Sequence, residues 1–153
     1  SPLQDLSRPS RGRILFVIPS PLMFKTRFGA FDGASWEQLL QQVLKRKFED
    51  SDYQPFPPSP GDYGLEGVSL KKGDGFQCYC PSKHYNRSEL YEKQRDKITE
   101  DLGKLRKYEA EIKRLIGDAV LKRWIFITPE FDKHALIAHA RLKEADVRAW
   151  KLS

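Results

Sequence analysis

Apolar residues recur along the chain with two different spacings, and these spacings distinguish strands from helices. Short apolar runs at 14–18 and 124–128 predict β-strands. Two more, at 65–70 and 76–80, flank a Lys-Lys-Gly-Asp-Gly sequence that is typical of a hairpin turn. The stretch 54–64 is rich in proline and glycine, and it predicts an irregular connection without a helix.

Helical spacing occurs in three segments between these strands. The first opens at Ser35, where a glutamine three residues later fits a capping box. The second covers roughly 88–116, and Gly103 inside it favours a kink or a break. The third follows Thr128, which can cap it, and a last short strand is predicted at 147–152. Strands separated by helices predict an α/β fold with a mixed β-sheet and helices on its faces.

The predicted strand at 76–80 alternates between apolar and polar residues. Phe76, Cys78 and Cys80 share one face, which suits the core. Gln77 and Tyr79 share the other face, which suits a cleft.

Oxygen-bearing side chains gather near this hairpin. The candidates are Glu37, Asp62, Glu66 and Gln77. Glu66 and Gln77 lie opposite each other only if the turn is centred between residues 71 and 72, whereas a turn centred on Gly73 puts Glu66 opposite Cys80. Carboxylate and amide oxygens are ligands for Mg²⁺ or Mn²⁺, and such an ion activates water against a phosphodiester. The other interpretation is structural: a turn aspartate, solvent-facing strand residues and a glutamate near a helix start.

Charge is distributed unevenly along the chain. The 153 residues carry a net charge of +6. Residues 31–81, which contain all four oxygen-bearing candidates, carry −3, between +4 at 1–30 and +4 at 82–123. A basic surface around an acidic block suits a protein that binds a polyanion and a divalent cation. No apolar run reaches the roughly 20 residues of a membrane span, and two cysteines make no disulfide framework, so we expect a cytoplasmic protein.

Three sequence blocks together resemble a known family. They are Ser-Trp-Glu-Gln-Leu-Leu at 35–40, Gly-Asp-Tyr-Gly-Leu-Glu-Gly at 61–67 with Phe-Gln-Cys-Tyr at 76–79, and Trp-Ile-Phe-Ile-Thr-Pro-Glu-Phe at 124–131. In this order they resemble the Mrr-type restriction endonuclease domain of the PD-(D/E)xK nuclease superfamily. The resemblance implies a restriction-endonuclease-like mixed central β-sheet flanked by helices. This domain would cover residues 31–153, after an N-terminal extension over 1–30 with one short strand.

The resemblance also assigns roles to individual residues. Glu66 would be the metal-binding acid, at a position where the family usually has aspartate. Gln77 would take the second acid position, Glu37 would be the helix acid, and Asp62 would support the site. Tyr79 stands where the family has its lysine, and a phenol supplies no positive charge.

Three outcomes follow from Tyr79. Another lysine reaches the site, with Lys83, Lys93 and Lys45 as candidates. Alternatively, Tyr79 serves together with the metal alone. In the third outcome the site is inactive and the domain only binds.

The function implied by the resemblance is an endonuclease domain that uses Mg²⁺ or Mn²⁺ to hydrolyse DNA, double-stranded by expectation. It would be the effector of a bacterial restriction or anti-phage defence system, with further domains, subunits or a second copy for recognition and activation. Phosphate contacts are expected from Lys83, Lys93, Lys97, Lys104 and Lys107. One alternative is an inactive nuclease-fold module that binds nucleic acid or a protein. Another is an oligomerisation domain built on the long helix.

Overall fold

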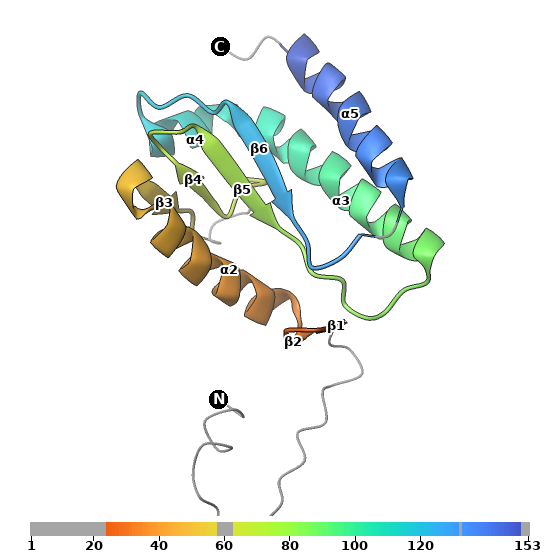
Figure 1. Ribbon diagram of the computed structural model, residues 1–153. Helices are drawn as coiled ribbons and strands as arrows, with labels where there is room; N and C mark the ends of the chain where they lie inside the picture. The colour runs from red at the N-terminus through yellow and green to blue at the C-terminus, as the bar shows by residue number, and fades with distance from the viewer. Residues whose placement is uncertain (1–23, 58–62, 132, 151–153) are drawn as a thin grey trace, which may run out of the picture.

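The computed structural model describes residues 24–57, 63–131 and 133–150 (Figure 1). Its elements, in chain order, are β1 (Phe24–Thr26), β2 (Gly29–Phe31), α2 (Gly33–Lys47), the 3-10 turn η1 (Glu49–Ser51), β3 (Tyr53–Pro55), β4 (Gly67–Ser69), β5 (Asp74–Cys78), α3 (Arg87–Lys107), α4 (Glu109–Ile116), β6 (Arg123–Ile127) and α5 (His134–Ala149). The strand predicted at 14–18 lies outside the described residues. The strand predicted at 147–152 is wrong where it can be compared, because residues 147–149 are the last turn of α5.

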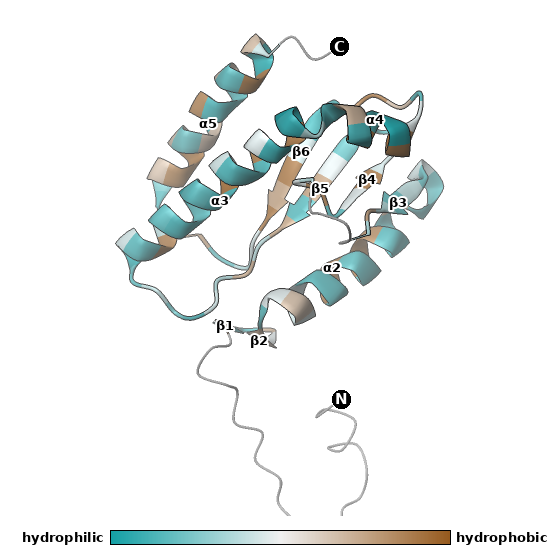
Figure 2. Cartoon of the chain, turned by 180° about the vertical axis from the view of Figure 1, so that it is seen from behind, coloured by the Kyte–Doolittle hydropathy of each residue, from teal (hydrophilic) through white to brown (hydrophobic). Residues whose placement is uncertain are grey.

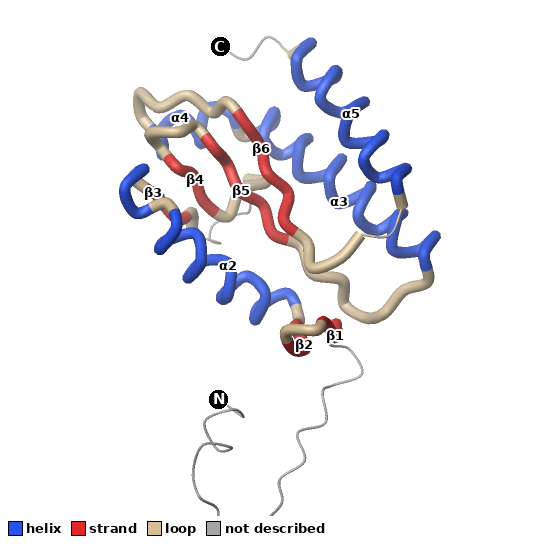
Figure 3. The backbone as a smooth tube through the Cα atoms, in the orientation of Figure 1, coloured by secondary structure: helices blue, strands red, loops and turns tan. Residues whose placement is uncertain are grey.

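Four strands form the central sheet in the order β3-β4-β5-β6. β3, β4 and β5 run antiparallel in succession, and β6 is parallel to β5. Figures 1 and 3 show α2 on one side of this sheet and α3 on the other, with α5 packed against α3. The expectation of an α/β protein with a mixed sheet is therefore confirmed at this level.

Each face of the sheet has its own core. On the α2 face, Phe76 of β5 packs with Leu44 and Phe48. On the α3 face, a larger cluster joins strand residues to α3, α4 and α5, and it includes Leu65, Val68, Ile98, Leu102, Leu105, Ile112, Ile116 and Leu136. In Figure 2, which views this second side, α3 is mostly hydrophilic, whereas hydrophilic and hydrophobic residues alternate along α5. Residues of β5 therefore alternate between the two faces, as predicted for Phe76 and Gln77, but the face of Gln77 is buried against α3 and is not the cleft that was expected.

Helix α2 begins two residues before the predicted start. Asp32 is the N-cap and accepts a hydrogen bond from Ser35 N at 2.8 Å, while Ser35 Oγ accepts one from Asp32 N at 2.9 Å. Ser35 is thus the third helical residue of a capping box and not its cap. Glu37 consequently lies beyond the first turn, where the helix dipole acts less strongly on a carboxylate.

The first residues of β5 and β6 are joined by an ion pair. Arg123 Nε and Nη2 donate to the two carboxylate oxygens of Asp74 at 2.7 and 2.8 Å, and Asp74 is 1% exposed. The hydrogen bonds from Arg123 hold the pKa of Asp74 below its ordinary value. A bidentate pair therefore fixes the register of the two parallel strands at their start.

Acid should weaken the fold through this pair. Because the pKa of Asp74 is lower in the folded than in the unfolded chain, its stabilising contribution is complete above about pH 5 and is lost as the pH falls through the folded pKa. We expect Asp74→Asn to lower the urea midpoint at neutral pH and to flatten its decrease between about pH 5 and about pH 3. Asp118→Asn, on the loop before β6, is the control. An unchanged acid profile in Asp74→Asn would contradict the assignment.

Candidate functional site

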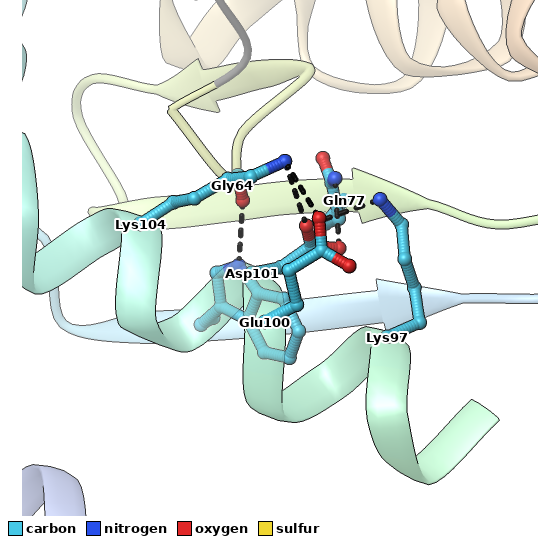
Figure 4. A network of polar contacts seen from close by, with 7 residues as sticks. Gly64, Gln77, Lys97, Glu100, Asp101 and Lys104 are labelled. Carbon is cyan, nitrogen blue, oxygen red and sulfur yellow. Dashed lines mark hydrogen bonds and ion pairs between the residues drawn. The ribbon is translucent and has the colours of Figure 1, made fainter. Parts of the chain in front are cut away.

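Gln77 lies in the central strand β5 and faces α3. Its side chain is buried, with 1% of the residue exposed, and its Nε2 donates a hydrogen bond to Asp101 Oδ2 at 3.0 Å. Asp101 belongs to α3 and has no exposed surface (0%). A strand amide and a helix carboxylate therefore meet inside the molecule (Figure 4).

Two lysines of α3 approach the same carboxylate. Lys97 Nζ lies 3.1 Å from Asp101 Oδ1, and Lys104 Nζ lies 3.7 Å from the same oxygen. Lys104 also pairs with Glu100 at 3.3 Å. The side chains of Lys97 and Lys104 are 23% and 26% exposed, so they connect the buried carboxylate to the surface. We call Gln77, Lys97, Asp101 and Lys104 the Asp101 cluster.

The chain segment before β4 packs directly against this part of α3. Gly64 has a positive φ of 80°, and a Cβ at this position would lie 2.3 Å from the carbonyl oxygen of Asp101. The carbonyl oxygen of Gly64 accepts a hydrogen bond from Trp124 Nε1 at 2.9 Å, which ties the segment to β6 (Figure 4). Glycine at residue 64 therefore allows the backbone to reach Asp101.

A second buried amide connects α3 to the end of β6. Gln94, 1% exposed, donates from Nε2 to Thr128 Oγ1 at 3.2 Å and to the carbonyl oxygen of Glu130. Sequence reasoning missed both Gln94 and Asp101. The signal was available, because each is a polar residue at helical spacing within the apolar stripe that contains Ile98.

Tyr79 lies on the same face of the sheet as Gln77. Its ring stacks on Phe126 with centroids 6.1 Å apart, and burial raises the pKa of its hydroxyl to about 12. Tyr79 is therefore a neutral phenol at physiological pH. Asp101, the hydrogen-bond partner of Gln77, pairs with Lys97 and Lys104, so these two lysines bring positive charge close to Gln77.

The hairpin adopts the first of the two possible registers. Gly67 pairs with Phe76 and Ser69 with Asp74, so the turn is centred between residues 71 and 72. However, Glu66 N also donates to Phe76 O at 2.7 Å, although Gly67 is the partner of Phe76. Leu65 and Val68, three residues apart, both enter the core on the α3 face. In a regular strand, residues three apart point to opposite faces of the sheet. A β-bulge at Glu66 and Gly67 therefore interrupts the alternation of side chains.

Because of this bulge, Glu66 is directed to the α2 face. Burial is the main cause of the raised pKa values of Tyr53 and Cys78, and the charges of Glu66 and Glu37 raise both further. Cys78 is next to Gln77 in β5 and faces the opposite way. The structure thus brings Glu37 and Glu66 to the same side and places Gln77 on the other. Asp62 lies outside the described residues.

The lysines expected near the site are placed at several locations. Lys83 and Lys93 both approach the ring of Tyr85, at 5.2 and 5.7 Å from its centroid. Lys107 lies 5.2 Å from the ring of Tyr108. Lys45 lines a shallow groove on α2 together with Glu37. Lys97 and Lys104 were expected only as phosphate contacts, and they are the lysines that contact Asp101.

The Asp101 cluster contains one carboxylate and one amide as potential oxygen ligands of a divalent cation, and the carboxylate is paired with two lysines. Within residues 24–57, 63–131 and 133–150 no group of three or more His, Cys, Asp or Glu side chains is arranged around one point. The amide of Gln77 and a carboxylate oxygen of Asp101 are nevertheless 3.0 Å apart. Adjacent ligands of octahedral Mg²⁺, at 2.0–2.1 Å from the metal, have about this separation. Rotation of the amide by 180° presents its oxygen at the same point.

Comparisons with known proteins found no relative of this chain. No family model matches it, and no curated protein or solved structure matches it. Among the described residues, no helix is long and apolar enough to cross a membrane. Function is therefore inferred from the chain's own side chains and from the resemblance of its sequence blocks.

Proposed function

We propose that this chain is a metal-dependent DNA endonuclease domain whose active centre is the Asp101 cluster, in place of the Glu66–Gln77 site that the resemblance to PD-(D/E)xK nucleases implies. The observation that carries the proposal is the meeting of three groups. The amide of Gln77 lies 3.0 Å from the carboxylate of Asp101, and the ammonium of Lys97 lies 3.1 Å from that carboxylate. Acid and amide oxygens can ligate a divalent cation, and a lysine can stabilise negative charge on a phosphate, which are contributions that assist phosphodiester hydrolysis.

Each residue of the cluster has a role in this proposal. Gln77 and Asp101 would hold Mg²⁺ or Mn²⁺, which supplies Lewis acidity to the phosphate and a water of lowered pKa. Lys97 would donate hydrogen bonds to a non-bridging phosphate oxygen, where negative charge develops. Lys97 thereby replaces the positive charge that Tyr79 lacks. Lys104 neutralises Asp101 from the other side, and a role in bacterial restriction or anti-phage defence is consistent with the resemblance.

Burial favours a second candidate, an inactive nuclease-fold module. Gln77 and Asp101 are 1% and 0% exposed, so a phosphate contacts them only after the surrounding chain moves. If the cluster stays closed, it stabilises the contact between β5 and α3 and does no chemistry. The protein would then bind nucleic acid or a protein partner through its surface alone.

A comparison of the two faces of the sheet tests the proposal. Cleavage of supercoiled, linear and single-stranded DNA is measured with Mg²⁺ or Mn²⁺ and with EDTA, for wild type, Gln77→Ala and Glu66→Ala. We expect cleavage that requires the metal, a loss of about tenfold or more in Gln77→Ala, and nearly full activity in Glu66→Ala. Urea midpoints of both variants separate loss of activity from loss of fold.

Three results would overturn this assignment. Loss of cleavage in Glu66→Ala with retention in Gln77→Ala would move the active centre to the α2 face, beside Glu37. Absence of cleavage in the wild type with every substrate and both metals would favour the inactive module. Equal activity of all three proteins would indicate a contaminating nuclease.

A further inference from the structure

Helix α3 carries lysines along the side that reaches the Asp101 cluster. Lys93, Lys97, Lys104 and Lys107 fall within about 80° around the helix and extend over about 21 Å of its length. Glu89 and Glu100 share this side, and Asp101 pairs with Lys97 and Lys104, so the four lysines meet three acids. We call these four lysines the α3 ridge.

An aromatic ring with a lysine beside it lies at each end of the ridge. At the N-terminal end, Lys83 from the preceding loop and Lys93 from α3 both approach the half-buried ring of Tyr85. Its hydroxyl is fixed by a 2.8 Å hydrogen bond with Ser82 Oγ. At the C-terminal end, Lys107 lies 5.2 Å from the ring of Tyr108, which packs against Tyr63 with centroids 4.9 Å apart.

A row of ammonium groups with an aromatic ring at each end fits one class of ligand. Lysines contact a phosphate backbone without regard to sequence, and an aromatic ring stacks on a base whose face is exposed. In a duplex the base faces are covered by their neighbours, so the rings favour an unpaired strand. Lys97 and Lys104, in the middle of the ridge, would then hold a phosphate next to Asp101.

We propose that the α3 ridge binds single-stranded DNA, with a base stacked on Tyr85 and the backbone running along α3 toward Lys104. This inference rests on the proposed nuclease function and names its substrate class, an unpaired strand and not an intact duplex. The rings set the path of the strand, because they stand at the two ends of the ridge. The Asp101 cluster lies between them.

Binding is measured apart from cleavage. The full chain is titrated in EDTA against a fluorescein-labelled oligo(dT) of about 12 nucleotides and against a hairpin duplex of the same length, by anisotropy. We expect the single strand to bind at least about tenfold more tightly than the duplex, with affinity decreasing between about 50 and about 200 mM salt. Tyr85→Ala should weaken single-strand binding about tenfold and Tyr85→Phe less than about twofold, because the ring persists.

The chain offers matched controls. Phe28, 77% exposed, lies beside Arg27 with its ring 4.6 Å from the guanidinium, and Phe28→Ala removes an aromatic–cation pair of the β1–β2 turn, which is not part of the ridge. Lys113→Gln on α4 matches Lys93→Gln in charge, and only the latter should reduce the salt dependence. Equal effects of Tyr85→Ala and Phe28→Ala, or equal affinity for duplex and single strand, would overturn the inference. Metal-dependent cleavage with equal affinities would leave the proposed function standing. Single-strand binding without cleavage would support the ridge and count against the nuclease.

Discussion

Asp101→Asn is expected to lower the rate of DNA cleavage by about 10²–10³-fold and also to lower stability, because the change removes a buried carboxylate that pairs with two lysines. Asparagine keeps the shape of the side chain and one oxygen, but it removes the negative charge that would hold a divalent cation. It also removes the carboxylate that lies 3.1 Å from Lys97 and 3.7 Å from Lys104. Initial rates at saturating Mg²⁺, with the circular dichroism spectrum of the variant, measure the effect.

Neighbouring acids and lysines provide controls for this experiment. Asp96→Asn changes a carboxylate of the same helix whose side chain is 69% exposed, and we expect wild-type activity. Lys97→Met should lose activity about as strongly as Asp101→Asn, whereas Lys113→Met should not. Retained cleavage in Asp101→Asn, with an intact fold, would show that the chemistry takes place elsewhere.

Gly64→Ala is expected to cost about 2–4 kcal/mol of unfolding free energy, a large effect for the addition of a single methyl group. The φ of 80° is unfavourable for alanine, and its Cβ would lie 2.3 Å from the backbone oxygen of Asp101. Neither atom belongs to a flexible side chain, so the segment before β4 and helix α3 must separate. Cleavage should decrease together with stability, because α3 carries the carboxylate. Urea unfolding, monitored by tryptophan fluorescence, measures the loss.

Gly103→Ala is the matched substitution in the same helix. No atom lies within 4 Å of a Cβ at Gly103, and its backbone is helical. Alanine should therefore stabilise the protein by about 0.5–1 kcal/mol. Stabilisation by both variants would contradict the close backbone contact at Gly64.

Local patterns in the sequence predict which segments are helical better than they predict where each helix begins and ends. The long helix is present, but it ends at Lys107 and α4 begins at Glu109, whereas the sequence favours a break at Gly103. Buried Leu102 and Leu105 on either side hold the helix together across the glycine. Strand β3 escapes prediction because it includes Pro55, which an edge strand tolerates at its end.

The candidate site is predictable only in part, and the reason is tertiary. Strand alternation identifies Gln77, and the hairpin register that favours its meeting with Glu66 is present. The bulge at Glu66 is invisible to alternation, because one inserted residue reverses the face of a side chain. Asp101 is a charged residue in an apolar stripe, and its interpretation depends on Gln77, 24 residues away in sequence.

The parallel pairing of β5 with β6 has a consequence for the order of folding. Asp74 and Arg123, partners at the start of the two strands, are 49 residues apart in sequence, and α3 and α4 lie between them. Helices form within about a microsecond, while contacts that close a long loop form slowly. Helix α3 should therefore exist before β6 joins the sheet. Until then Gln94 lacks Thr128 and Glu130 as acceptors, so the face of α3 that carries the Asp101 cluster is completed last.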